Sequence, residues 1–232
     1  MTEPLETARD NHFDDDPVSI ALTKRIKGMK PGDRLPSERD LAIELGVSRT
    51  ALRDRLAVLV GLGSLERQIG SGTYVAELRP QTLALALSLG LSSANLPIHA
   101  LESVRIALER QAAIEACADP DPTLTGHMQK ALDIMAVATT SVEMHKADRD
   151  FHQAMLRVSG NPALIFFADV LADTLSQSMA ERSVRLREKH TEEGLCDLFI
   201  ELHKPIYDSI MSGDEEKAVL AVEEHFDVVM LY

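Results

Sequence analysis

The chain has 232 residues, of which 45% are hydrophobic, and its formal net charge is −13. That length favours two modest domains or one large one, and the apolar content is enough for a real core. Aromatic residues make up only 4% and Trp is absent, which favours packed helices over a β-sandwich. Cys117 and Cys196 form no C-x-x-C pair, so neither a disulfide framework nor a zinc knuckle is indicated.

No segment resembles a targeting or membrane-spanning sequence. The N-terminus, MTEPLETARDNHFDDD, is acidic and lacks the apolar core of a signal peptide. The longest apolar stretch, LALALSLGL from Leu83, is too short to cross a bilayer. We therefore expect a soluble, cytoplasmic protein that makes no contact with a membrane.

The charge is distributed unevenly along the chain. Residues 1–16 hold one Arg against six acids, residues 17–78 hold ten Lys and Arg against seven acids, and residues 79–232 hold thirteen against twenty-four. The first segment is therefore predicted to be a disordered acidic tail. A basic segment inside an acidic chain indicates that only the middle part meets a polyanion such as DNA.

The middle segment, 17–78, has the pattern of a helix-turn-helix followed by a hairpin. After a first helix at 18–27, Ser37 is a good N-cap for a helix that ends at Gly46. Ser48 caps the next helix, which runs to about Leu62 and turns Leu52, Leu56, Leu59 and Val60 inward. The glycine-rich run IGSG then predicts a β-hairpin wing with Gly70 and Gly72 at positive φ. On this geometry the first turn of the second helix enters the major groove.

The run LPSERDLAIELGVSRTALRDRLAVLVGLGSLERQIGSGTYV resembles the winged helix-turn-helix of the GntR family of bacterial transcription regulators. The resemblance implies a double-stranded DNA operator. Because one winged helix reads only a few base pairs, we expect a homodimer that binds a short inverted repeat. The resemblance also implies DNA contacts from Arg39, Ser48, Arg49, Thr50, Arg53 and Gly70. Arg49 and Arg53 share one helix face, whereas Arg55 lies elsewhere.

The rest of the chain reads as helices alone. Residues 79–96 are predicted to be a linker and the first helix of this body, and residues 97–232 a helical domain. The helices are predicted at 82–91, 97–117, 123–139, 142–158, 161–188, 192–212 and 214–231. The fold class is therefore mainly α, with an N-terminal winged helix-turn-helix and a C-terminal antiparallel bundle of about seven helices.

Polar side chains interrupt the apolar stripes of this bundle. Asp148 and His152 are spaced i,i+4, and His203 and His225 each lie among apolar residues at helical spacing. An unpaired imidazole or carboxylate on a buried stripe costs a few kcal/mol, so these groups need partners. A shared divalent metal would partner all four, although each histidine taken singly is more often a core or surface residue.

ESVRIALERQAA, ADRDFHQAMLRVSGNPAL and LHKPIYDSIMSGDEEKAVLAVEEHFDVV are similar to the FCD-type effector domain of the FadR subfamily. The resemblance implies that Asp148, His152, His203 and His225 bind a metal and that Arg105 receives an effector carboxylate. One carboxylate and three imidazoles suit Zn²⁺, Ni²⁺ or Mn²⁺, with positions left for a 2-hydroxy or 2-keto acid. The alternative for Arg105 is a salt bridge to Glu102 or Glu109.

These patterns predict a homodimeric transcription regulator, and specifically a repressor, whose operator affinity changes when a small carboxylic acid binds the metal-containing domain. One alternative is a metalloenzyme with a DNA-binding appendage, since open metal positions also suit hydrolytic or oxygenase chemistry. Against it, the sequence shows no Glu, Asp or His beside the ligand motifs to act as a general base, because Asp150 points away from the Asp148–His152 face. The other alternative is a metal sensor, for which the ion itself is the signal.

Overall fold

The computed structural model describes residues 16–94 and 100–229, except for the side chains of 176–188, of 192–193 and of 229. The acidic tail predicted over 1–16 therefore lies outside the described residues, apart from Asp16. The chain divides into two compact units, Met1–Thr82 and Leu83–Tyr232. Each unit is built around its own cluster of buried apolar side chains.

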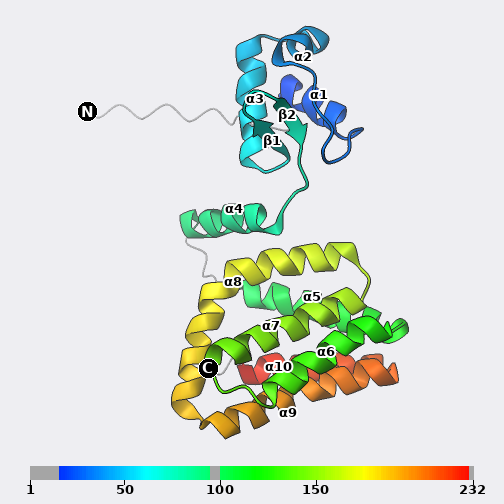
Figure 1. Ribbon diagram of the computed structural model, residues 1–232, viewed down its shortest axis with the longest axis vertical. Coiled ribbons are helices and arrows are strands. Elements are labelled where there is room, and N and C mark those ends of the chain that lie inside the picture. The colour runs from blue at the N-terminus through cyan, green and yellow to red at the C-terminus, as the bar shows by residue number, and fades with distance from the viewer. Residues whose placement is uncertain (1–15, 95–99, 230–232) are drawn as a thin grey trace, which may run out of the picture. The chain divides into compact units, whose positions relative to one another are not determined.

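The first unit is a winged helix-turn-helix (Figure 1). Its elements are α1 (Pro17–Ile26), α2 (Glu38–Leu45), α3 (Arg49–Gly61), β1 (Leu65–Gln68) and β2 (Gly72–Val75). Leu52, Leu56 and Leu59 are buried as predicted, while Val60 is only partly buried. They pack with Leu22 and Leu41 of the two preceding helices, so the apolar face of α3 holds the unit together.

Local side-chain chemistry sets the ends of these helices. The Ser37 hydroxyl accepts from the Asp40 amide at 3.2 Å, and the Ser48 hydroxyl accepts from the Ala51 amide at 3.1 Å. Gly46 ends α2 in the left-handed conformation, with φ of 67°. The turn between α2 and α3 is therefore closed at both ends by groups that the sequence identifies.

The wing is an antiparallel hairpin in which Leu65 pairs with Val75 and Gln68 with Gly72. Gly70 and Gly72 have φ of 75° and 137°, as the glycine-rich tip predicts. One contact was not predicted. Arg34 bridges to Tyr74 on the other edge of β2, so the loop before α2 covers that edge.

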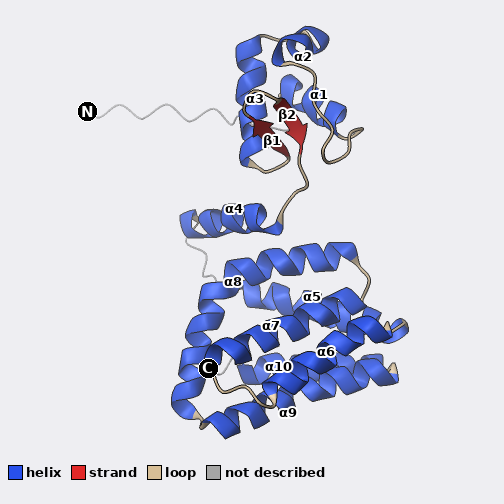
Figure 2. Ribbon diagram, in the orientation of Figure 1, coloured by secondary structure: helices blue, strands red, loops and turns tan. Residues whose placement is uncertain are grey.

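The second unit consists of helices in the described residues (Figure 2). They are α4 (Pro80–Ser93), whose first three residues belong to the first unit, α5 (Leu101–Ala118), α6 (Pro122–Met135), α7 (Ser141–Val158), α8 (Pro162–Lys189), α9 (Glu192–Ser212) and α10 (Glu215–Val229). All seven predicted helices are present. None of the described helices combines the length and the apolar character that a membrane crossing requires.

Two predicted helix bounds differ from the structure by four residues, and the others by no more than two. The helix predicted at 97–117 begins at Leu101, and residues 97–99 lie outside the described part. The helix predicted at 123–139 ends at Met135, because Thr140 starts a new helix. Thr140 and Glu143 form a reciprocal capping box, a signal that the prediction overlooked.

The core of the bundle lies where α5, α6, α7, α9 and α10 meet. Phe151 on α7 and Phe226 on α10 are among its largest fully buried side chains. The Phe151 ring stands edge-on to those of His152 and His203, at centroid distances of 5.7 and 5.0 Å. Polar groups and the apolar core are therefore parts of one packed layer.

The third arginine of α3, Arg55, has a structural partner in Asp16. Asp16 is the N-cap of α1, and its carboxylate also lies 2.9 Å from Nε of Arg55. Hydrogen bonds from Arg55 and Ser19 lower the pKa of Asp16 from its ordinary 3.8 to about 2. Asp16 is thus an anchor of the first unit rather than the last residue of a detached tail.

We expect Asp16→Asn to lower the melting temperature of the first unit at pH 7, because the neutral amide loses the ion pair. The folded pKa is depressed, so the stabilisation is complete above pH 3.8 and is lost as pH falls through about 2. The difference between variant and wild type, followed by circular dichroism, should shrink over that range. Glu44→Gln, which breaks an exposed ion pair to Arg25, is the control and should change little. Equal melting of wild type and Asp16→Asn at pH 7 would contradict the assignment.

Candidate functional site

The four predicted metal ligands come together in the second unit. Asp148 and His152 lie on α7, His203 on α9 and His225 on α10. One donor atom from each lies within 4.8 Å of the others, and the three imidazoles are buried. Donors around a single ion at about 2.0–2.2 Å lie slightly closer than this. Three helices separated in sequence therefore converge on a space the size of one ion.

The His203 ring turns its Nε2 toward a carboxylate. Its Nδ1 lies 2.7 Å from the carbonyl oxygen of Phe199, which can only accept, so Nδ1 carries the hydrogen. In the neutral ring Nε2 then has no hydrogen, yet it lies 3.0 Å from Oδ1 of Asp148. Two acceptors face each other, and only a proton or a metal ion between them removes the repulsion.

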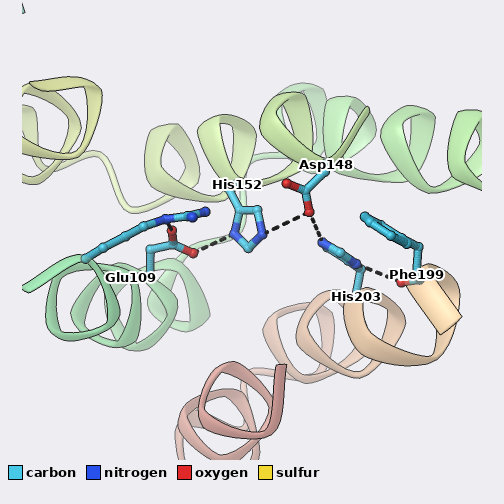
Figure 3. Close-up of polar contacts among 6 residues, drawn as sticks. Glu109, Asp148, His152, Phe199 and His203 are labelled. Atoms are coloured by element: carbon cyan, nitrogen blue, oxygen red, sulfur yellow. Dashed lines mark hydrogen bonds and ion pairs between the residues drawn. The ribbon is translucent and has the colours of Figure 1, made fainter. Parts of the chain in front are cut away.

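His152 has the same arrangement on the opposite side (Figure 3). Its Nδ1 lies 2.5 Å from Oε2 of Glu109, and its Nε2 lies 3.7 Å from Oδ1 of Asp148. Among the described residues Nε2 of His152 and Nδ1 of His225 have no hydrogen-bond partner. A carboxylate behind one ring nitrogen is typical of metal-binding histidines, because it fixes the tautomer that turns the other nitrogen to the ion.

The carboxylates of Asp148 and Glu109 favour a positive charge at the cluster. Burial opposes a charge on His152, but Glu109 and Asp148 outweigh it and raise the pKa of His152 to about 9. Burial, followed by the neighbouring His203 and His152, holds the pKa of His225 well below its usual range. A divalent ion would supply the positive charge that the carboxylates otherwise draw from a proton. The donor set, three imidazoles and one carboxylate, fits such an ion.

Glu109, which the sequence analysis named only as a possible partner of Arg105, also contacts His152. Its Oε1 lies 2.7 Å from Nε of Arg105, and both side chains are buried. Burial opposes the charge of Glu109, yet His152 and Arg105 hold its pKa at about 2. The salt-bridge alternative for Arg105 is therefore the arrangement present. The prediction that no acid lies beside the ligand motifs was wrong, because α5 brings Glu109 to His152 from outside those motifs.

A pocket of about 360 Å³ adjoins the cluster along α5, α7 and α8. It is lined by the polar side chains of Arg105, Glu109 and His152 and by the apolar Leu156. Two further charged residues, Arg149 and Asp169, also line it. His145, to which we assigned no function, also lines it. The pocket thus reaches the cluster past the Arg105–Glu109 pair.

The predicted DNA-contacting residues are exposed on the first unit. They are Arg39, Ser48, Arg49, Thr50, Arg53 and Gly70. The Ser48 hydroxyl caps α3, and Arg53 lies 2.8 Å from the carboxylate of Glu38. An exposed basic first turn on the second helix of this motif is the geometry that reads a major groove.

A winged helix-turn-helix joined to a helical bundle with a ligand-sized pocket defines a DNA-binding transcription regulator. Residues 18–75 match the bacterial regulatory proteins of the gntR family, and residues 100–228 match the FCD domain. The chain belongs to the GntR family and carries an FCD domain.

Curated relatives and a solved structure agree with this family assignment. The chain is 31% identical to the HTH-type transcriptional regulator LutR of Bacillus subtilis, over 85% of this chain and 90% of LutR. It is 29% identical to the putative L-lactate dehydrogenase operon regulatory protein of Escherichia coli, over 88% and 79%. The structure of a Streptococcus agalactiae GntR protein has the same fold, with a TM-score of 0.62 and 21% identity, covering 93% and 98%. These relatives are regulators, so the metalloenzyme alternative is set aside.

We expect Glu109→Ala to destabilise the second unit by about 3–5 kcal/mol, because it removes a buried carboxylate that pairs with both Arg105 and His152. Urea denaturation followed by circular dichroism measures the effect. The double variant Arg105→Ala/Glu109→Ala should cost less than the sum of the two single changes, since the two side chains contact each other and their shared interaction is lost only once. Asp208→Ala removes an exposed ion pair of the same i,i+4 spacing, to Lys204, and should cost far less. A cost for Glu109→Ala no greater than for Asp208→Ala would contradict the buried pair.

Proposed function

We propose that this regulator binds a divalent metal ion at Asp148, His152, His203 and His225, and that a small organic acid at this ion changes its affinity for operator DNA. The observation that carries the proposal is that Nε2 of His203 lies 3.0 Å from the Asp148 carboxylate while its Nδ1 lies 2.7 Å from the Phe199 carbonyl oxygen. His152 repeats that orientation, with Glu109 behind its other nitrogen. Zn²⁺, Ni²⁺ and Mn²⁺ all accept this donor set.

The pocket supports an acid as the effector. Its volume, about 360 Å³, is at the small end for ligand sites, and it leads to His152 and to the Arg105 guanidinium. A bound metal would supply open positions for a carboxylate and an adjacent oxygen. Arg105 would then pair with the effector carboxylate, either in place of Glu109 or together with it. The resemblance to a protein named for an L-lactate dehydrogenase operon favours a 2-hydroxy acid.

The proposal includes a cytoplasmic homodimer acting as a repressor on an inverted repeat. One winged helix reads only a few base pairs, so two-fold pairing is needed for a selective site. The DNA contacts would come from Arg39, Arg49, Arg53, the hydroxyls of Ser48 and Thr50, and the wing at Gly70. Their common exposure on the first unit supports this assignment.

We expect His203→Ala to remove most of the metal from the purified protein, because it deletes one of the four donors and its hydrogen bond to Phe199. Elemental analysis of protein prepared without chelator measures the loss. The variant should also lose the rise in melting temperature that small 2-hydroxy and 2-keto acids give the wild type. His127→Ala, an exposed histidine on α6, is the control and should retain both properties.

Two outcomes would overturn parts of this proposal. If elemental analysis of the wild type found no stoichiometric metal, the metal-site assignment would be wrong. The polar cluster would then be a hydrogen-bonded network around a directly bound acid. Operator release by metal alone, with no acid present, would make the protein a metal sensor. Binding of acids to the metal-loaded wild type and not to His203→Ala would support the full proposal.

For the DNA-contacting face, we expect Arg49→Ala to weaken operator binding by about 1–3 kcal/mol if Arg49 reads a base edge. The probe is the duplex that the wild type selects from a randomised library, and the selected sites should be inverted repeats. Arg25→Ala, which removes an exposed arginine from α1, should leave the affinity almost unchanged. Equal weakening by both variants would show that total charge matters and not the position of Arg49.

A further inference from the structure

Glu38, the first residue of α2, joins two arginines from different elements. Its Oε2 accepts from both Nε and Nη2 of Arg53 on α3, at 3.1 and 2.8 Å. Its Oε1 accepts from Nη2 of Arg67 on β1, at 3.0 Å. One carboxylate therefore links the second helix of the motif to the wing.

The surface around Glu38 is cationic although an acid lies within it. The Glu38 side chain is 25% exposed, while those of Arg53 and Arg67 are 56% and 45% exposed. The hydrogen bond from Arg53, together with the nearby charges of Arg53, Arg67 and Arg49, lowers the pKa of Glu38 against the effect of burial. Three positive side chains thus surround one negative group that they partly cover.

The way Glu38 holds Arg53 suits base recognition. Glu38 occupies the edge of the guanidinium formed by Nε and Nη2, which leaves the edge at Nη1 for another acceptor. A long arginine side chain loses rotamer freedom when it binds, and a fixed carboxylate that already restricts it reduces that loss. A guanine presents the two acceptors that such an oriented guanidinium can bind.

Arg67 has no role in the contacts assigned so far. It lies on β1 opposite Thr73, close to the glycine-rich tip of the wing. Arg34 on the far edge of β2 bridges to Tyr74, so both sides of the hairpin are held in place. The position of Arg67 is therefore fixed relative to Arg53 through Glu38, and fixed relative to the wing through the hairpin.

We propose that Arg67 is a further DNA-contacting residue, which binds a backbone phosphate, and that Glu38 is a positioning residue that makes α3 and the wing engage the duplex as one unit. The inference rests on the proposed DNA-contacting face and adds to it. Glu38 has two opposing effects. Its negative charge weakens binding to any DNA, whereas its hold on Arg53 strengthens binding to the correct sequence.

The experiment compares the duplex selected by the wild type with a scrambled duplex of the same length, over a series of salt concentrations. Glu38→Gln should bind the scrambled duplex more tightly and the selected duplex more weakly, lowering the ratio of the two affinities about ten-fold, as expected for one base contact. Glu38→Asp keeps the charge but shortens the reach, so it should lower the ratio while scrambled-duplex affinity stays at the wild-type value. Arg67→Gln should weaken both duplexes alike and reduce the salt slope by about one.

Glu44→Gln on the same helix is the matched control, because it makes the same charge change and breaks an exposed ion pair to Arg25. An unchanged affinity ratio in Glu38→Gln and Glu38→Asp, or an equal change in Glu44→Gln, would overturn the positioning role. An unchanged salt slope in Arg67→Gln would overturn the phosphate contact. A wild type that selects no sequence would instead contradict the DNA-contacting face itself, so the two failures are distinguishable. Circular dichroism of each variant verifies the fold.

Discussion

Buried charge that must be compensated is the constraint on which the second unit depends. Arg105, Glu109, His152, Asp148 and His203 form a continuous line of contacts through the core (Figure 3). Each charged or polar group in that line has its partner on another helix or one turn away, since an unpaired buried charge would cost several kcal/mol. Polar satisfaction therefore fixes how α5, α7 and α9 face each other, in addition to the apolar packing around them.

In the proposed function, the same line is the route by which the domain responds to a ligand. The pocket contacts Arg105, Glu109 and His152, so an acid that takes up Arg105 changes the partner of Glu109. Glu109 in turn lies behind the nitrogen of His152 that is opposite the cluster. In the proposed function, an acid that pairs with Arg105 would favour one pairing of this line over another, which is the requirement for any shift between states. A fully apolar core would offer no such alternative pairing.

Acidic side chains have an organising role in the basic first unit as well. Asp16 caps α1 and holds Arg55, and Glu38 holds Arg53 and Arg67. Of the three arginines that crowd the short stretch GVSRTALRDRL, Arg55 is therefore structural, whereas Arg49 and Arg53 stay on the exposed face. The distinction depends on helix periodicity, because Arg55 lies on another side of α3 from Arg49 and Arg53.

The sequence alone determined the element order, the two-part organisation and the turn and wing glycines, because caps and periodicity are local. The four candidate metal ligands, by contrast, came from the resemblance to the FCD-type domain, since only Asp148 and His152 share a local i,i+4 spacing. The predicted end of α6 was wrong, because a capping box at Thr140 was overlooked. Glu109 could not be placed beside His152, nor Glu38 between Arg53 and Arg67. Each of those partners is distant in the chain, and only the packing of whole helices and the wing brings them into contact. Tertiary structure thus decided which charged groups share a partner, since long-range contacts leave no periodic trace in the sequence.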